Sequence, residues 1–84
     1  MEIHSAARKH GYSDQAILHA IRYAVTIVDL EPDTDPPRTL AIGPDQHGNL
    51  LEVIWLDLDA GSQLVIHAMA LRPLFHHLLP QLED

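Results

Sequence analysis

The sequence predicts a single α+β domain in which two N-terminal helices and a C-terminal helix cover a four-stranded antiparallel sheet. Three observations lead to this prediction. The chain has only 84 residues, which is room for one domain spanning residues 1–84. Hydrophobic residues make up 46% of the chain and charged residues 20%, which is typical of a folded globular protein. The links between the expected strands are short, and short links favour antiparallel neighbours.

The first part of the chain is predicted to be helical. Residues 2–10 carry small and apolar side chains at helical spacing and run into Gly11, which suits a helix end. Ser13 is a typical N-cap for a second helix over residues 14–24. The stripe of this second helix that we expect to be buried consists of Ile17, Leu18, Ala20, Ile21 and Ala24.

Four strands and a last helix are predicted after the second helix. The strands are expected at residues 25–30, 38–42, 50–58 and 63–68, where β-branched or alternating apolar residues occur. The segments between them contain glycine, proline, asparagine or aspartate, which favour turns. The last helix is expected to begin at Pro73 and to stop before Pro80.

Charge and composition argue against several classes of function. Five basic residues against twelve acidic ones give a net charge of -7, which disfavours nonspecific binding to nucleic acid. There is no cysteine, so disulfides are absent. No apolar run reaches the roughly 18 residues of a membrane span and no secretory signal is seen, so we expect a cytoplasmic protein without membrane contact. The seven histidines form no pair at metal-ligand spacing on one helix face, so we expect no metal and no cofactor.

A carboxylate in the third predicted strand is the first candidate for chemistry. Glu52 is the one charged residue among apolar neighbours, and the hairpin to the fourth strand brings it near His67 or Ala68. Alternation puts His67 on the same face as Val65 and Met69. A carboxylate beside a histidine raises its basicity for proton transfer. The alternative interpretation is a partly buried ion pair.

Arginine and histidine residues outside that strand supply the other candidates. Arg72 follows the fourth strand and is suited to hold a phosphodiester with two parallel hydrogen bonds; its alternative role is pairing with Glu52 or with the acidic C-terminal residues 83–84. Arg8, Lys9 and His10 form a second basic group, of which at most two side chains can serve one site. The alternative for this group is solvated surface, which we favour for Lys9.

Several short segments together carry a resemblance to a known family. They are Lys9-His10-Gly11, the helix that begins at Ser13, and the segments 41–43, 50–56 and 65–69. In this order they resemble the BrnT-like toxins, small bacterial proteins related to the RelE superfamily of ribonuclease toxins. The chain differs from that family in having no aromatic-bearing strand before the first helix. It also has Met69 where a basic residue is usual, and Arg72 is the only candidate to replace it.

The resemblance implies a compact α+β fold, metal-independent cleavage of RNA and a cognate antitoxin protein as partner. On this interpretation the chain is the toxin of a bacterial type II toxin–antitoxin system. His67 would be the base or the acid, Arg72 would hold the phosphate and Glu52 would orient His67. His10 or Arg8 would take the third catalytic role, and Arg8 and Lys9 would bind RNA.

The alternative is a noncatalytic protein-interaction module on the same fold. It is suggested by the negative charge, by Met69 and by an apolar second sheet face bearing Ile54 and Leu56. Such a module would act as a homodimer or larger homo-oligomer, or bound to a partner protein.

Overall fold

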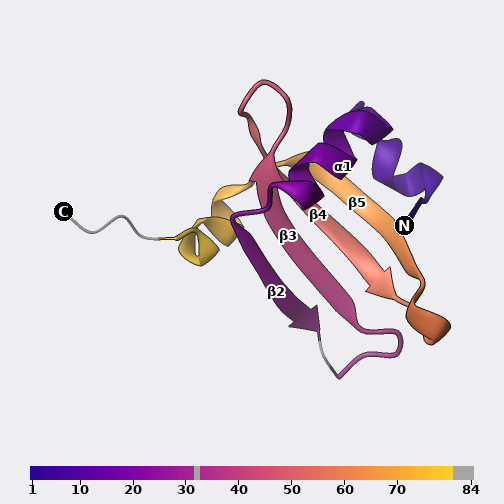
Figure 1. Ribbon diagram of the computed structural model, residues 1–84. Helices are drawn as coiled ribbons and strands as arrows, with labels where there is room; N and C mark the ends of the chain where they lie inside the picture. Colours follow the sequence, from indigo (N-terminus) through magenta and orange to yellow (C-terminus); the bar gives the residue numbers. More distant parts are fainter. Residues whose placement is uncertain (32, 81–84) are drawn as a thin grey trace.

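A five-stranded mixed sheet forms the centre of the structure, a computed structural model that describes residues 1–31 and 33–80 (Figure 1). In chain order the strands are β1 (Glu2–Ile3), β2 (Thr26–Glu31), β3 (Arg38–Pro44), β4 (Leu50–Asp57) and β5 (Gln63–Ala70). They lie in the order β1-β5-β4-β3-β2, so β1 and β2 are the two edges. Neighbours from β2 to β5 are antiparallel, whereas β1 runs parallel to β5.

The predicted fold class is wrong as a whole, although its four long strands lie within two residues of their expected limits. The sheet has five strands and is mixed, not four-stranded and antiparallel. Only one α-helix is present among the described residues, and the expected first and last helices are replaced by 3₁₀ turns. The antiparallel hairpins were predictable because each is local in sequence, whereas the parallel β1–β5 pair joins the two ends of the chain.

The N-terminal segment is a strand followed by a 3₁₀ helix where a helix over residues 2–10 is expected. Ile3 pairs with Val65 of β5, which makes the segment a sheet edge. The Nδ1 atom of His4 then accepts a hydrogen bond from the amide of Ala6 at 3.0 Å and begins η1 (Ser5–Arg8). Within η1 only Ala7 is buried, so the segment has too little apolar surface to stabilise a longer helix.

The one α-helix, α1 (Asp14–Arg22), begins as predicted. The hydroxyl of Ser13 accepts a hydrogen bond from the amide of Ala16 at 3.0 Å, the geometry of an N-cap. The predicted buried stripe is wrong for Leu18, which is 44% exposed. The helix ends two residues early because Val25 and the residues after it enter the sheet.

Helix α1 lies so close to β3 that one strand position must be glycine. A Cβ atom built at Gly43 would lie 1.9 Å from the backbone oxygen of Ala20. Gly43 was expected in a turn, but β3 continues through it to Pro44. The missing side chain therefore sets the distance between the helix and the sheet.

The C-terminal helix of the prediction is the 3₁₀ helix η3 (Pro73–Leu78). Its hydrogen bonds join residues three apart, from the amide of Phe75 to the oxygen of Arg72 at 3.0 Å and from Leu79 to His76 at 3.1 Å. Prolines at both ends leave too few residues for a stable α-helix. Residues 83–84, the expected alternative partners of Arg72, lie outside the described residues.

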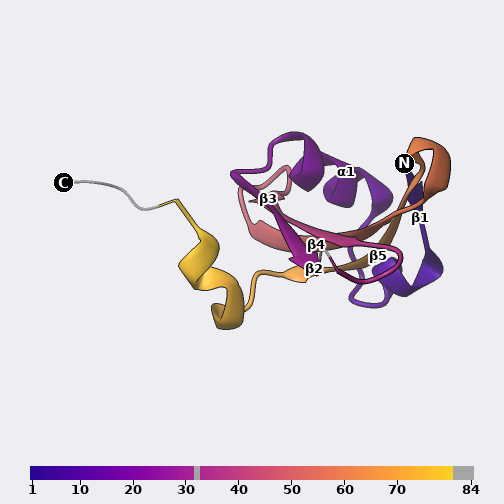
Figure 2. The same ribbon diagram turned by 90° about the horizontal axis from the view of Figure 1, so that it is seen from below.

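Two separate groups of apolar residues pack on the two faces of the sheet. Helix α1 covers one face, here called the α1 face, and η3 lies on the opposite side, the η3 face (Figure 2). Buried on the α1 side are Ala7, Ala16, Ile17, Ala20, Ala41, Leu51, Val53, Trp55, Val65 and Ala68. Buried on the η3 side are Leu40, Ile42 and Phe75, with Val28, Leu30, Leu50, Ile54, Leu71, Leu78 and Leu79 packed around them.

Candidate functional site

A carboxylate buried in the sheet organises the candidate site. Alternation along β4 directs Leu51 and Val53 to the α1 face, and Glu52 between them to the η3 face. Glu52 is completely buried, yet each of its carboxylate oxygens is hydrogen-bonded. Burial of a charge is costly unless such bonds compensate it, so the partners of Glu52 are part of what allows this strand to fold.

Arg72 supplies most of these hydrogen bonds. Its backbone amide donates to Oε1 of Glu52 at 2.9 Å, its Nε lies 3.1 Å from both oxygens, and its Nη2 donates to Oε2 at 2.7 Å. The guanidinium thus meets the carboxylate side-on and lies 5.7 Å from the ring centre of Phe75. A guanidinium has five N–H groups, and this arrangement leaves the Nη1 side free of described protein partners. The side chain is 43% exposed, so those donors are accessible to a ligand.

His67 is the second partner of Glu52. Its Nε2 atom lies 2.9 Å from Oε2 of Glu52. An ionised carboxylate can only accept, so Nε2 carries the proton, and Nδ1 of the neutral ring is left as a free acceptor. No described protein group hydrogen-bonds to Nδ1, and the side chain is 24% exposed. The carboxylate therefore fixes both the orientation and the tautomer of the ring.

A bulge in β5 brings His67 to this position. Ile54 pairs with His67 but Trp55 pairs with Val65, so Ile66 is an extra residue in the ladder. The predicted sharing of one face by Val65 and His67 is therefore wrong, because Val65 packs on the α1 face. Glu52 is near His67 as expected, but it reaches the ring diagonally.

The direct cross-strand neighbour of Glu52 is Met69, not His67 or Ala68. Met69 is apolar and offers the carboxylate no cation. The cation comes instead from Arg72, beyond the end of β5.

His10 completes a group of four residues that we call the Glu52 cluster: Glu52, His67, Arg72 and His10. The rings of His10 and His67 lie edge to face with their centres 5.9 Å apart. Residues 9–13 between η1 and α1 carry His10 to this place, with Gly11 at a φ of +86°. Two imidazoles and a guanidinium from distant parts of the chain thus lie together at one end of β5.

An ion pair joins Arg8 and Asp14, the two residues that flank the segment 9–13 carrying His10. Nε and Nη2 of Arg8 donate to the two carboxylate oxygens of Asp14 at 2.8 and 2.9 Å. These bonds lower the pKa of Asp14 and raise the pKa of Arg8. Arg8 is therefore held by α1 and does not enter the Glu52 cluster, whereas His10 lies beside His67.

The electrostatics of the cluster keep both of its charged partners ionised. Burial on its own would raise the pKa of Glu52, but the hydrogen bonds from Arg72 and His67 outweigh it and lower the pKa. The hydrogen bond to Glu52 in turn raises the pKa of Arg72. The ion pair expected as the alternative interpretation is thus present. It occupies one side of Arg72 and one nitrogen of His67, and leaves the other side of each group unbound.

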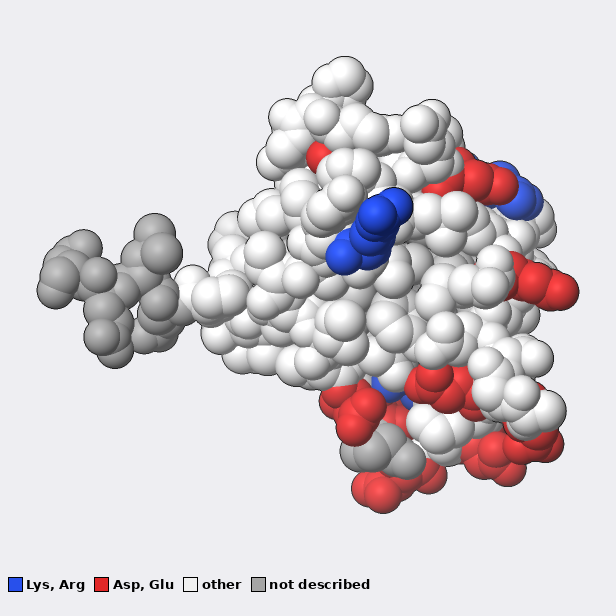
Figure 3. Space-filling model, viewed as in Figure 1, with Lys and Arg blue, Asp and Glu red and all other residues white. Residues whose placement is uncertain are grey.

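Few positive charges are unpaired over the described residues. Arg8, Arg38 and Arg72 pair with Asp14, Glu31 and Glu52, and no ion pair is formed by Lys9 or Arg22. Lys9 is exposed beside His10, as expected for a solvated residue or a phosphate contact. On the face seen in Figure 3, basic side chains are scattered and acidic ones gather chiefly at the lower end.

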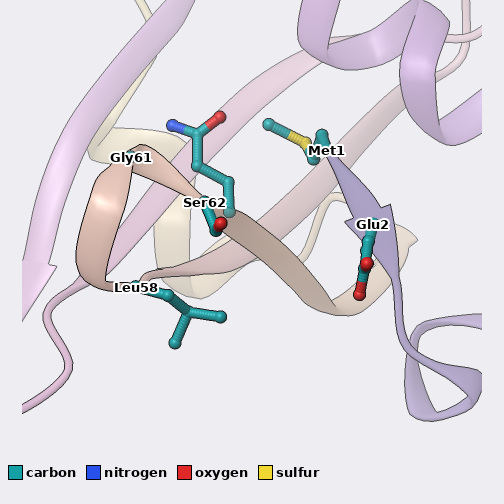
Figure 4. Close-up of a pocket in the computed structure, with 6 residues that line it drawn as sticks. Met1, Glu2, Leu58, Gly61 and Ser62 are labelled. Carbon is teal, nitrogen blue, oxygen red and sulfur yellow. The ribbon is translucent and has the colours of Figure 1, made fainter.

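A surface pocket lies away from the Glu52 cluster. It has a volume of about 370 Å³ and lies between the N-terminal strand and the β4–β5 turn (Figure 4). Its lining consists of Met1, Glu2, Leu58, Gly61, Ser62 and Gln63. None of these residues belongs to the cluster, and Glu2 is the only titratable side chain among them. The cavity therefore offers less chemistry than the cluster.

Comparison with protein-family models, curated protein sequences and solved structures finds no match to this chain. Within the described residues, no helix combines the length and the apolar character needed to cross a membrane. Function must therefore be argued from the cluster itself. Sequence reasoning named all four of its members but missed Phe75, which lies beneath Arg72; the apolar residue two positions after Pro73 was the available signal.

Proposed function

We propose that the chain is a metal-independent endoribonuclease, acting as the toxin of a bacterial type II toxin–antitoxin system. One observation carries the enzymatic part: the carboxylate of Glu52 binds one side each of His67 and Arg72 and leaves a basic nitrogen and guanidinium donors on the other side. The toxin role, with a cognate antitoxin as partner, is supported by the sequence resemblance.

Cleavage of RNA through its 2′-hydroxyl requires the three groups that the cluster contains. Nδ1 of His67 takes the proton from the 2′-hydroxyl, and the 2′-oxygen attacks phosphorus. The free N–H groups of Arg72 stabilise the negative charge that develops on the phosphate oxygens. Protonated His10 gives its proton to the 5′-oxygen as the bond from phosphorus to that oxygen breaks. The products are a 2′,3′-cyclic phosphate and a 5′-hydroxyl.

Glu52 acts in this scheme as a positioning residue. It does not touch the substrate, but it holds Nε2 of His67 as the protonated nitrogen and stabilises the positive charge the ring gains when it accepts the proton. The same carboxylate orients Arg72, so the base and the phosphate-binding cation are fixed relative to one another.

The enzymatic proposal is tested on a purified protein with a labelled RNA oligonucleotide in EDTA. His67→Gln keeps a donor for Glu52 but cannot accept a proton at Nδ1, so cleavage should fall by about 10² to 10⁴. Arg72→Lys keeps the positive charge but lacks the additional N–H donors of a guanidinium. We therefore expect the cleavage rate to fall by about 10². His19→Gln and Arg22→Lys are matched controls outside the cluster and should cleave like the wild type.

The toxin proposal is tested by inducing the chain in bacteria. Wild-type induction should arrest growth with loss of RNA, and Arg72→Ala should relieve both. Equal growth for the two strains, with RNA intact in each, would contradict the proposal.

A noncatalytic interaction module is the second candidate, and the ion pairs of Glu52 favour it because they engage both His67 and Arg72 in the fold. The uncovered apolar face that the sequence suggested does not support this candidate, because Ile54 packs against the buried apolar residues on the η3 face. A folded protein that cleaves no RNA would favour this candidate.

A further inference from the structure

Strand β2 is an edge strand with a free side. It pairs with β3 alone, at the end of the sheet opposite β1. In an antiparallel ladder every second residue directs its backbone N–H and C=O to one neighbour, and the alternate residues direct theirs to the other side. Over the described residues, the outer side of β2 therefore offers backbone donors and acceptors to an added strand.

One face of β2 is also uncovered. Thr26, Val28 and Leu30 face η3, where the hydroxyl of Thr26 donates to the oxygen of Leu78 at 3.0 Å. The alternate residues point to the α1 face, but α1 lies over β3 and β4 and leaves β2 open (Figure 1). Ile27 is 58% exposed there, and Val25 just before the strand is 50% exposed.

The uncovered face changes from apolar to acidic along its length. Beyond Val25 and Ile27 comes the exposed carboxylate of Asp29, whereas a bulge after Asp29 sets Glu31 opposite Arg38 on the other face, and Asp33 follows in the adjoining loop. Acidic side chains gather at this end of the molecule (Figure 3). Glu31 lies 3.7 Å from Arg38, which leaves Asp29 without an ion pair among the described residues.

This charge pattern argues against a second copy of the chain as the occupant. Two β2 strands paired antiparallel about a twofold axis at Val28 would set Asp29 of each copy opposite Ile27 of the other, so neither carboxylate would meet a cation. The chain also carries a net charge of -7, so two copies repel one another.

We infer that the β2 edge binds an extended segment of a basic partner protein, which adds to the sheet as a sixth strand. The backbone supplies affinity and the side chains supply specificity. An antiparallel segment would place a basic residue opposite Asp29, and small apolar residues opposite Ile27 and Val25. The inference does not depend on the proposed nuclease, because β2 and the Glu52 cluster lie in different parts of the sheet.

The experiment uses two labelled eight-residue peptides and the full chain. In the first peptide, threonine alternates with four other residues, which are arginine, arginine, valine and valine in that order. In the second peptide, glutamate replaces both arginines. Fluorescence anisotropy at low salt should show binding of the first peptide at least tenfold tighter than of the second. Amide chemical shifts of the isotope-labelled chain should change chiefly in β2.

Matched variants connect the binding to the β2 edge. Asp29→Lys should weaken the basic peptide at least tenfold, whereas Glu2→Lys on the opposite edge should change its Kd by less than twofold. Ile27→Thr, an exposed change that keeps strand propensity, should weaken it severalfold even if Asp29→Lys proves unstable. Equal binding of both peptides, unchanged affinity in the β2 variants, or a dimer in light scattering that buries β2 would overturn the inference.

Discussion

The two faces of the sheet use the same strands for different purposes. On the α1 face, alternate residues of β4 and β5 are apolar and pack against a helix that approaches to backbone contact at Gly43. On the η3 face, the residue between two of these core positions is Glu52, and a short 3₁₀ helix covers the sheet only in part. The first face is apolar where α1 covers it, whereas the second contains a buried charge with partners that remain partly exposed.

This difference shows how a domain of 84 residues can hold an ionised group at its centre. The α1 face holds the larger group of buried apolar residues, so its packing can offset the cost of burying Glu52 on the η3 face. A disturbance of the α1 face should therefore act on folding. A disturbance of the η3 face should act on chemistry and, at Glu52 and its partners, on folding in a way that depends on pH.

The largest expected effect on stability is on the α1 face. Gly43→Ala places a methyl group against the backbone oxygen of Ala20, where no side chain can move aside. We expect the free energy of unfolding to fall by about 3 kcal/mol or more in urea titrations. Gly48→Ala is the control, because its Cβ atom would meet nothing within 4 Å. Its only expected loss of stability comes from placing alanine at a φ of +86°. Equal losses for the two variants would mean that α1 does not lie as close to β3 as described.

Removal of Arg72 should destabilise the chain in a way that depends on pH. In the wild type, hydrogen bonds lower the pKa of Glu52 below its ordinary value of 4.5 despite burial, so this stabilisation is present above pH 4.5 and is lost as the pH falls. In Arg72→Ala, burial dominates and should raise the pKa of Glu52 above that value. The destabilisation caused by the substitution should then be larger at pH 7 than at pH 4.

Urea unfolding at both pH values measures this difference. Arg22→Ala, an exposed arginine at the end of α1, should show no such dependence. A deficit for Arg72→Ala that is the same at pH 4 and pH 7 would contradict the assignment of the buried charge to Glu52.

A smaller effect is expected where η3 is tied to the sheet. Thr26→Val removes the hydrogen bond from the hydroxyl to the oxygen of Leu78 and keeps the side-chain shape. The free energy of unfolding should fall by about 1 kcal/mol. Thr34→Val, in the exposed loop after β2, removes hydrogen bonds that tie no element to the sheet and should cost less. The reverse order would mean that η3 is held by its apolar contacts alone.

The smallest effect on stability is expected at the ion pair beside His10. Asp14→Asn weakens the bonds to Arg8, which are exposed to solvent, so the unfolding midpoint should change little. RNA cleavage should nevertheless fall about tenfold, because the segment that carries His10 is held less well. Asp59→Asn, in the turn after β4, should change neither quantity. A loss of cleavage that parallels a loss of stability would mean that Asp14 acts only on folding.

Local signals in the sequence predicted much of this architecture. Alternation located β2 to β5, Ser13 located the start of α1, and the isolated carboxylate in β4 pointed to Glu52. The failures involve features without a local signal. The parallel β1–β5 pair is a contact across the whole chain, and the bulge at Ile66 shifts the faces of β5 by one residue.

The candidate site was predicted in its membership but not in its geometry. Glu52, His67 and Arg72 were named because charged residues at strand positions and strand ends are unusual. Their hydrogen bonds depend on the register of β5 and on the turn into η3, which pattern alone does not fix. The prediction that two helices flank the N-terminus failed because propensity over nine residues is weaker than pairing with a sheet edge.

The central claim is that the η3 face holds groups arranged to cleave RNA through its own 2′-hydroxyl. The most direct test is to incubate the wild-type chain in EDTA with an RNA oligonucleotide and with the same oligonucleotide carrying 2′-deoxyribose throughout. The account predicts that the RNA is cut to products ending in a 2′,3′-cyclic phosphate and that the deoxy strand stays intact. Survival of both strands, or cleavage of both, would contradict it.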